Sequence, residues 1–412
     1  MSIRKRRWQT GKGEWREAWQ LDYADQHGER QRKSFATKAE AVAFETNVRV
    51  QVRDGTHVAP NRDVTVKDAA DIWIKAVKAG RGDRPPAERS TTRQYAYHVR
   101  LYLVPMLGPV KLGQLSQARV MAFRDELLEA LSRPLARKVL ASLKGILSEA
   151  QDRGLVAINH AAKVRIGNAT RDDETGADVP AIADIKAILA KLDELAVPDG
   201  TPIGAITSKA WRRRRVLLCA AIHTGMRASE LRGLAWDAVD LRKGVIHVRQ
   251  RADEWGVIGP PKSKAGRRSI PIPPSLVSLL KQWKVECPPG ELVFPSDEGR
   301  PQSLSNIYNR AWKPIQLSAG VCDPAKDAEG KVKRDKDGNP VMAPRYNFHS
   351  LRHFHAAMLI ADGANPKEVQ AELGHSSIQV TFDTYGSLFV DEDAERRQKA
   401  RAGRLENILS GT

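Results

Sequence analysis

The sequence lacks the features that mark secreted, membrane-spanning or metal-binding proteins. Its 412 residues include three cysteines, an odd number without Cys-x-x-Cys spacing, so we expect the thiols of a reducing compartment and no disulfide framework. No stretch approaches the roughly 18 consecutive apolar residues that a membrane-spanning helix needs. The basic residues 1–7 are not followed by an apolar segment, which argues against a secretory signal. These absences predict a cytoplasmic protein with no membrane partner.

Positive charge is what the sequence has in excess. Lys and Arg number 67 against 49 Asp and Glu, a formal net charge of +18. Such a chain attracts phosphates, so an acidic polymer is the expected partner, although charge alone does not identify a specific one. The length indicates two or three domains, and 41% hydrophobic residues suffice for globular cores.

The hydrophobic pattern predicts a multidomain, mainly α protein with small β-sheets. Residues 15–23 alternate apolar and polar, which favours a small antiparallel sheet of three strands at the N-terminus. Thr37 and Glu40 have capping-box spacing, so a helix is expected to begin there. Helical periodicity then predicts four or five packed helices up to about residue 153.

A polar, glycine-containing stretch follows, and the next domain boundary is expected near residues 170–178. Beyond it the pattern predicts a mixed α+β domain. Its strands are expected around 245–248 and 267–272, with a third around 292–294.

Five polar side chains in the C-terminal half have the chemistry to surround one phosphate. They are Arg227, His349, Arg352, His375 and Tyr385. Two guanidiniums can grip the non-bridging oxygens of a phosphodiester, imidazoles can donate hydrogen bonds or move protons, and a phenol can attack phosphorus. Together they predict a covalent phosphoryl-transfer site.

The order and spacing of the motifs around these residues resemble the tyrosine recombinase family, in particular phage-type integrases. The resemblance covers most of the chain, and four short motifs in the correct order make it specific. It implies an N-terminal arm-type DNA-binding module at 1–60, a helical core-binding domain at 64–168, a catalytic domain at 178–400 and a C-terminal tail at 401–412.

The resemblance also implies a role for each site residue. Arg227, held by Glu230, and Arg352 would clamp the phosphate, His349 would accept the tyrosyl proton, and His375 would donate a hydrogen bond to the phosphate. Tyr385 would be the nucleophile that forms a 3′-phosphotyrosyl intermediate. A lysine near the turn at 265–266 would protonate the leaving 5′ hydroxyl, and the candidates are Lys264 and its rival Lys262.

A metal site is the main competing interpretation of the histidines. His349 and His353 are one helical turn apart, with His355 close behind, but no His-Glu-x-x-His string or carboxylate cluster completes a zinc site. We therefore predict no metal and interpret His353 and His355 as packing residues. The ester energy is kept in the phosphotyrosine, so the implied reaction needs neither ATP nor Mg²⁺ and no cofactor is expected.

Basic residues outside the catalytic motifs are candidates for DNA contact. The predicted set is Arg4, Lys5, Arg6, Arg7, Lys12, Arg16, Arg93, Arg137 and Lys138.

Two departures from the family pattern stand out. Ser387 stands two residues after Tyr385, where relatives often carry histidine, so no role is assigned to it. Residues 318–345 form a charged insertion, which is either a hairpin near DNA or a disordered segment.

The predicted function is a site-specific DNA recombinase that integrates a phage or mobile element. Its expected partners are double-stranded DNA with attachment sites, three further copies of the chain in a homotetramer, and accessory proteins such as an excisionase and a DNA-bending protein. The segment 391–409 is a candidate for docking on a neighbouring protomer. A type IB-like topoisomerase and a non-catalytic DNA-binding regulator with the same fold are the alternatives.

Overall fold

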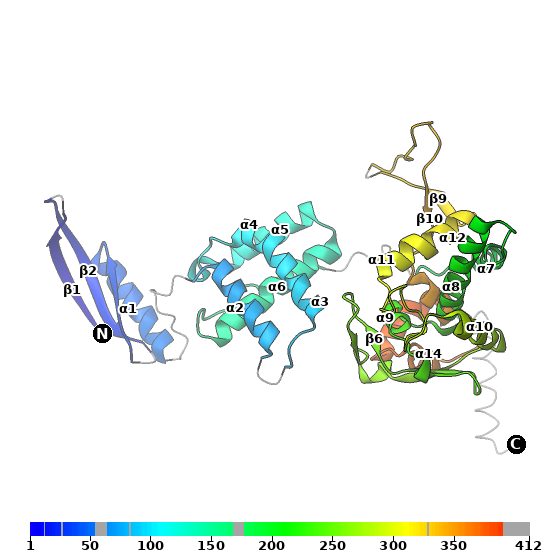
Figure 1. Cartoon of the computed structure of the whole chain (residues 1–412). Coiled ribbons are helices and arrows are strands. Elements are labelled where there is room, and N and C mark those ends of the chain that lie inside the picture. The colour runs from blue at the N-terminus through cyan, green and yellow to red at the C-terminus, as the bar shows by residue number, and fades with distance from the viewer. Residues whose placement is uncertain are drawn as a thin grey trace, which may run out of the picture. The chain divides into compact units, whose positions relative to one another are not determined.

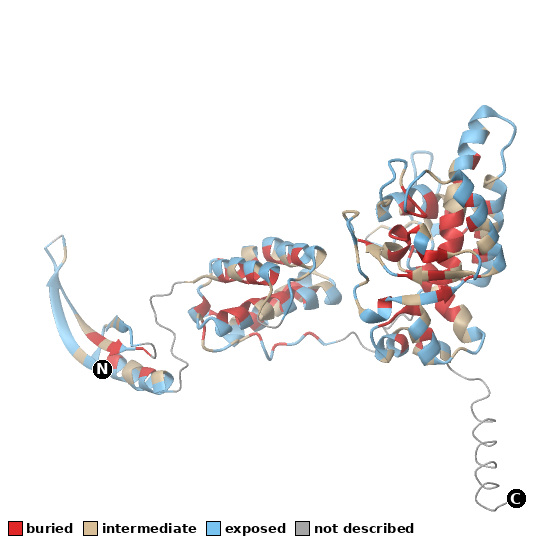
Figure 2. Ribbon diagram, turned by 60° about the horizontal axis from the view of Figure 1, so that its bottom comes forward, coloured by how far each residue is buried: buried red, intermediate tan, exposed pale blue. Residues whose placement is uncertain are grey.

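The computed structural model describes residues 1–11, 13–25, 28–53, 64–81, 84–167, 177–327 and 329–389 (Figures 1 and 2). The chain divides into two compact units, Met1–Asp173 and Glu174–Thr412. Lys12 and the predicted docking segment 391–409 lie outside the described residues, so their predicted roles stay predictions. No helix in the described part is long and apolar enough to cross a membrane.

The chain begins with a three-stranded antiparallel sheet and a helix, as predicted. The strands are β1 (Ser2–Gln9), β2 (Trp15–Ala24) and β3 (Arg30–Phe35), and the helix is α1 (Lys38–Arg53). The Thr37 hydroxyl accepts the Glu40 N–H, and the Glu40 carboxylate accepts the Thr37 N–H, which is the expected capping box.

A helical bundle follows in the same unit. Its elements are α2 (Val66–Ala79), α3 (Arg89–His98), the π-helical turn η1 (Val99–Leu103), α4 (Val104–Leu107), the 3₁₀ turn η2 (Leu112–Gln114), α5 (Gln117–Ala130) and α6 (Arg133–Asp152). Trp73 of α2 packs against Gly145 of α6, where an added Cβ would lie 2.9 Å from the indole. The absence of a side chain at Gly145 therefore lets the two helices approach closely.

The second unit is built around a long central helix, α8 (Pro202–Thr224), whose C-terminal half is almost wholly buried (Figure 2). Around it lie α7 (Ile182–Leu195), α10 (Pro274–Glu286), α11 (Leu304–Ile307), η6 (Tyr308–Trp312), α12 (Lys313–Ser318) and α13 (Ser350–Ala361). Three short helices, α9 (Ala228–Arg232), α14 (Pro366–Leu373) and α15 (Ile378–Tyr385), complete the helical part.

Two small sheets in this unit correct one detail of the sequence prediction. One sheet has the order β4–β5–β8, formed by Val239–Asp240, Val245–Val248 and Arg268–Pro271, and the other pairs β6 (Arg251–Ala252) with β7 (Ile258–Gly259). The strand expected at 292–294 does not form, because Leu292 makes an isolated bridge to Ala235 only. The third strand is β4, which is too short for a period-2 pattern to reveal.

The charged insertion contains two successive hairpin turns above a two-stranded base. Strands β9 (Cys322–Pro324) and β10 (Met342–Pro344) pair, and bridges join Lys326 to Val332 and Arg334 to Pro340 (Figure 1). Arg345 at the base binds Asp323 and Asp184. Of the two alternatives for this segment, the described residues have the hairpin.

Candidate active site

The site begins at the junction of α8 and α9. Helix α8 ends at Gly225, which adopts the left-handed conformation with φ +55°, and Arg227 is the residue immediately before α9. Glu230, one turn into α9, accepts the Arg227 backbone N–H at 3.0 Å and its Nη1–H at 2.9 Å. The carboxylate therefore fixes both the backbone and the guanidinium of Arg227.

Glu230 is shared with a second arginine, Arg268 of β8. Arg268 donates to both carboxylate oxygens, at 3.2 and 2.9 Å, and the side chains of Glu230 and Arg268 are 2% and 6% exposed. Burial alone would raise the pKa of Glu230, but the hydrogen bonds and charge of Arg268, with those of Arg227, hold that pKa below its usual value. Glu230 is thus an anion that orients two cations.

Three arginines from three separate segments bind the C-terminal end of α14. The last carbonyls of a helix lack partners within the helix and carry the negative end of its dipole, so guanidinium groups are favoured there. The bonds run from Arg268 Nε to Glu372 O at 2.6 Å, from Arg352 Nη2 to Leu373 O at 2.6 Å and from Arg227 Nη2 to Gly374 O at 3.1 Å.

Arg352, in the first turn of α13, is the most enclosed of the three. It is 3% exposed, and its other terminal nitrogen donates to Gly225 O at 2.8 Å. Burial and the positive charge of Arg227 lower the pKa of Arg352 to about 9. Its positive charge lacks a full counter-charge in the site, which an incoming anion would provide.

Gly374 and His375 connect this arginine cluster to the aromatic part of the site. Gly374 ends α14 with φ +67°, and a Cβ there would lie 2.7 Å from the carbonyl oxygen of Ala265. The His375 ring is buried, with Nδ1 2.9 Å from Thr381 Oγ1. Burial and the charges of Arg352 and Arg227 lower the pKa of His375 to about 4, so its imidazole is neutral at pH 7.

Tyr385 is the last residue of α15 and is 1% exposed. Its ring stacks on that of His375 at a centroid distance of 6.2 Å, and its hydroxyl lies 2.9 Å from Nδ1 of His353. Burial raises the pKa of Tyr385 to about 12, although Arg352 and Arg227 act in the opposite direction. The phenol is therefore protonated at pH 7 and needs a proton acceptor before it can attack.

His353 was interpreted from the sequence as a packing residue, and that interpretation is wrong. Burial and the charge of Arg352 lower the pKa of His353, which keeps its imidazole neutral. A neutral Nδ1 can accept the tyrosyl hydrogen. His355, the other histidine assigned to packing, makes a polar contact as well, with Nε2 3.0 Å from Glu372 Oε1.

His349 precedes α13 and lies next to His353, with ring centroids 4.9 Å apart. The residue is exposed to solvent, and the charges of Arg352 and Arg227 act on its ring. Partial removal from water, with the charges of His353, Arg352 and Arg227, lowers the pKa of His349 to about 4. Its imidazole too is neutral at pH 7.

The two lysine candidates lie on the turn between β7 and β8, and both are exposed. Lys264 begins a 3₁₀ turn, Lys264–Gly266, whose middle residue, Ala265, packs against Gly374. This contact places the turn beside the segment that carries His375. Lys264 is adjacent in sequence to the contacting residue, Ala265, whereas Lys262 lies three residues before it.

The structure brings Arg227, Glu230, Arg352, His375 and Tyr385 together, with His349 at the open side. The sequence prediction missed Arg268 and His353. Arg268 stands in the predicted strand without a motif of its own, and His353 directly follows Arg352. No group of three or more His, Cys, Asp or Glu side chains that could hold a metal ion occurs among the described residues.

The basic candidates of the N-terminal module are divided between the two faces of its sheet. The strand register places Lys5 and Arg7 on the face of buried Leu21, which packs against α1, whereas Arg4, Arg6 and Arg16 share the opposite face. Two arginines of β3, Arg30 and Arg32, alternate onto that opposite face as well. In the bundle, Arg137 and Lys138 are exposed on α6, and Arg93 lies on α3.

Comparison with known proteins identifies the family. The model of the phage integrase family matches residues 201–391. A tyrosine recombinase XerC-like protein of Caldanaerobacter subterraneus is 26% identical over 394 residues, which cover 88% of this chain and 89% of the relative. The prophage integrase IntR of Escherichia coli is 30% identical over 187 residues, 43% of each chain.

Two solved structures share the fold. The Tn1549 transposon integrase in complex with transposon right end DNA has a TM-score of 0.60 at 20% identity, over 82% of this chain and 99% of that one. A lambda integrase tetramer bound to a Holliday junction has a TM-score of 0.53 at 17% identity, over 90% and 95%. Residues 201–391 match the phage integrase family, and the relatives and solved structures support a tyrosine recombinase, an enzyme that breaks and rejoins DNA strands.

Proposed function

We propose that this chain is the integrase of a phage or mobile element and that Tyr385 is its nucleophile. One observation carries the assignment. The hydroxyl of a buried tyrosine lies 2.9 Å from a neutral imidazole, and its ring stacks on His375 beside Arg352 and Arg227. A packing tyrosine in a core does not need two guanidiniums and three imidazoles around it.

In the proposed reaction Tyr385 Oη attacks the scissile phosphorus, a P–Oη bond forms, and the P–O5′ bond breaks. The phenol proton passes to Nδ1 of His353, which is already within hydrogen-bonding distance. The role of proton acceptor that the family resemblance gave to His349 requires the tyrosine to move, because the described hydroxyl contact is with His353. His349 and His375 then act as hydrogen-bond donors to the phosphate.

The positive charge of the site is suited to a phosphodiester. Arg227 and Arg268 bind one carboxylate, Glu230, and Arg352 lies beside them at the end of α14, so the cluster has a surplus of two positive charges. Arg227 is the most open of the three at 36% side-chain exposure and is proposed to contact the phosphate directly. Arg352 is proposed to join it once the tyrosine moves toward the phosphate.

Lys264 is proposed to protonate the departing 5′ oxygen. The support is its place on the turn that packs against Gly374, next to the phosphate-facing loop. The free 5′ hydroxyl of a partner strand then attacks the phosphotyrosine, which reverses the chemistry without ATP or Mg²⁺. Lys262, two residues earlier, remains the rival.

The sheet face opposite α1 is proposed to bind arm-site DNA. Arg4, Arg6 and Arg16 lie on it with Arg30 and Arg32, and Trp8 is on the same side. Exposed guanidiniums on one sheet face suit phosphate contacts, while neighbouring side chains can enter a groove. In the bundle, Arg93, Arg137 and Lys138 are the proposed core-site contacts.

Exchange of two strands between two duplexes needs four active sites, so we propose a homotetramer on DNA. The lambda integrase structure is a tetramer on a Holliday junction, which supports this assembly for a chain of the same fold. An excisionase and a DNA-bending protein are proposed accessory partners, because arm and core sites on one DNA must be brought together.

The decisive experiment incubates the full chain with DNA carrying candidate attachment sites in EDTA. Wild type should form covalent protein–DNA adducts and joint molecules. Tyr385→Phe should form neither, while its non-covalent affinity for the same DNA stays within about threefold, because only one hydroxyl is lost. Persistent adducts in the variant would remove Tyr385 from the role of nucleophile.

The same assay separates the alternatives. A type IB-like topoisomerase would relax supercoiled circles without forming joint molecules, and a regulator would shift DNA in a gel without any adduct. The relatives reported above are recombinases and integrases, which favours joining over relaxation.

A further inference from the structure

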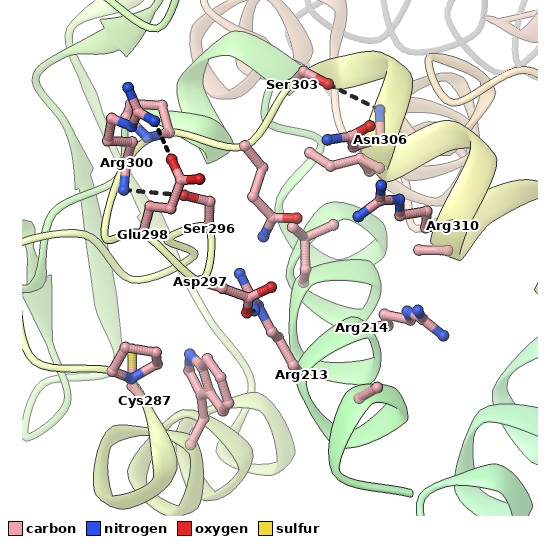
Figure 3. Close-up of a pocket in the computed structure, with 18 of the residues that line it drawn as sticks. Arg213, Arg214, Cys287, Ser296, Asp297, Glu298, Arg300, Ser303, Asn306 and Arg310 are labelled. Carbon is pink, nitrogen blue, oxygen red and sulfur yellow. Dashed lines mark hydrogen bonds and ion pairs between the residues drawn. The ribbon is translucent and has the colours of Figure 1, made fainter. Parts of the chain in front are cut away.

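A large hollow in the second unit lies away from the catalytic motifs. It is bounded by α8, the end of α10, the segment 296–303 and the helical stretch α11–η6, and its volume is about 1010 Å³ (Figure 3). None of Arg227, Arg352, His375 and Tyr385 lines it. Its lining is therefore separate from these catalytic candidates.

Five of the eight charged side chains that line this hollow are in ion pairs. Arg213 binds Asp297, and Arg300 binds Glu298 across the turn at 296–300. Glu286 at the end of α10 binds Arg212. These pairs use all three carboxylates that line the hollow.

Three cations remain. Among the described residues, Lys209, Arg214 and Arg310 make neither a hydrogen bond nor an ion pair through their side chains, although the Arg214 guanidinium lies over the Trp211 ring at 4.7 Å. Figure 3 shows Arg214 and Arg310 on the same side of the hollow. Burial and the charges of Arg213 and Arg310 lower the pKa of Arg214, a sign that its positive charge is uncompensated.

A neutral donor lies beside these cations. Asn306 of α11 presents its side-chain amide next to Arg310 (Figure 3). Like charges around a shared hollow repel one another, which costs free energy. A ligand with several anionic oxygens removes this repulsion, and guanidiniums bind phosphate oxygens with matched geometry.

We propose that this hollow is a second phosphate-binding site, in which Arg214, Arg310 and Lys209 hold a phosphate ester that is not the one being cleaved. A backbone phosphate of bound DNA and the phosphate of a free nucleotide have the same chemistry. The DNA source rests on the proposed function, whereas the nucleotide source does not.

The test uses the full chain in a Tyr385→Phe background, so that no covalent adduct forms. Affinity for a non-specific duplex is measured against salt concentration, and binding of dAMP and of inorganic phosphate is measured by titration calorimetry. The variants are Arg310→Gln, whose side chain is exposed and unpartnered, and Arg214→Gln. Arg300→Gln is the matched control. Arg300 lines the same hollow and its substitution removes the same charge, but in the wild type Arg300 is paired with Glu298.

If the site holds a DNA phosphate, each variant should flatten the slope of log affinity against log salt by about 0.9 and weaken binding at 0.1 M salt by about eightfold. The control should change neither quantity. If the site holds a free nucleotide, the variants should abolish dAMP or phosphate binding and leave duplex affinity unchanged. Either result supports a phosphate site and identifies its source.

Equal losses in Arg300→Gln would mean that only the general positive field matters, which overturns the proposal. So would unchanged binding of all three ligands in variants that retain the wild-type unfolding temperature. Adduct formation by the chain with Tyr385 intact is scored separately, so a failure of the recombinase assignment would be visible on its own.

Discussion

The buried ion pair between Glu230 and Arg268 gives the sharpest test of how the site is assembled. Arg268→Met keeps an unbranched apolar side chain and removes both hydrogen bonds to the carboxylate, which have lengths of 2.9 and 3.2 Å. Glu230, at 2% exposure, then keeps only Arg227 as its cationic partner. Removing one member of a buried pair typically destabilises a protein by about 3–5 kcal/mol, because the remaining charge is uncompensated.

For a unit of this size, each kcal/mol lowers the unfolding temperature by roughly 2–4 °C, so the expected fall is about 6–20 °C. Scanning calorimetry of the full chain measures it on the transition of the larger unit. Arg267→Met is the control, because Arg267 is adjacent to Arg268 in sequence but its side chain is exposed. It should change the free energy of unfolding by no more than about 0.5 kcal/mol. Single-turnover cleavage should also fall in Arg268→Met, because Glu230 no longer holds Arg227 in place.

The pH dependence checks the cause. In the wild type the pKa of Glu230 is below its unfolded value, so its stabilising contribution is present above that value and is lost as pH falls through the folded pKa. In Arg268→Met, burial of Glu230 would dominate and raise its pKa. Protonation of Glu230 should therefore reduce the variant's loss of stability as pH falls from 7 toward 4.5. A fall in unfolding temperature of less than about 2 °C, or one that does not become smaller on acidification, would refute the reasoning.

Two further predictions concern the proton acceptor and the loop that carries His375. His353→Gln should slow single-turnover cleavage by about 10²- to 10⁴-fold and remove the fall in rate that is expected of wild type as His353 is protonated at low pH. His349→Gln should keep that pH profile, and the opposite pattern would return the role to His349. Gly374→Ala should lower the unfolding temperature and the cleavage rate more than Gly363→Ala does. Both glycines have positive φ, but of the two only Gly374 would gain a Cβ that clashes, 2.7 Å from Ala265 O. Equal effects would show that backbone strain alone is responsible.

The sequence predicted the elements that have a strong local signal. The N-terminal sheet and the start of α1 follow from alternation and a capping box, and the strands at 245–248 and 268–271 follow from alternating apolar residues. The missing third strand has a physical reason: β4 is two residues long, and its pairing depends on β5, which a local pattern cannot show.

A turn pattern could have predicted the hairpins in the insertion. Among the described residues, six segments share one arrangement, in which a side-chain oxygen of the first residue accepts the N–H of the fifth and the fourth is a glycine with φ between +74° and +82°. They are residues 10–14, 25–29, 253–257, 296–300, 327–331 and 335–339. The spacing of Asp, Ser or Thr before glycine is visible in the sequence and favours a tight hairpin over disorder.

The site was predictable in its motif residues but not in its supports. Arg268 and His353 are recognisable only through contacts with residues far along the chain, Glu230 for the former and Tyr385 for the latter. The hollow beside α8 could not be predicted from the sequence either. Its unpaired cations come from helices about 95 residues apart, and they are recognisable as a cluster only once the ion pairs of the neighbouring charges are known.

The arginine cap on α14 has a consequence for newly made protein. Its three guanidiniums come from positions 227, 268 and 352, yet their shared acceptors are the backbone oxygens of residues 372–374. A ribosome-bound chain that has not yet extended past this helix has no scaffold on which the clamp can close. Assembly of the clamp therefore waits until residues 372–374 have been synthesised.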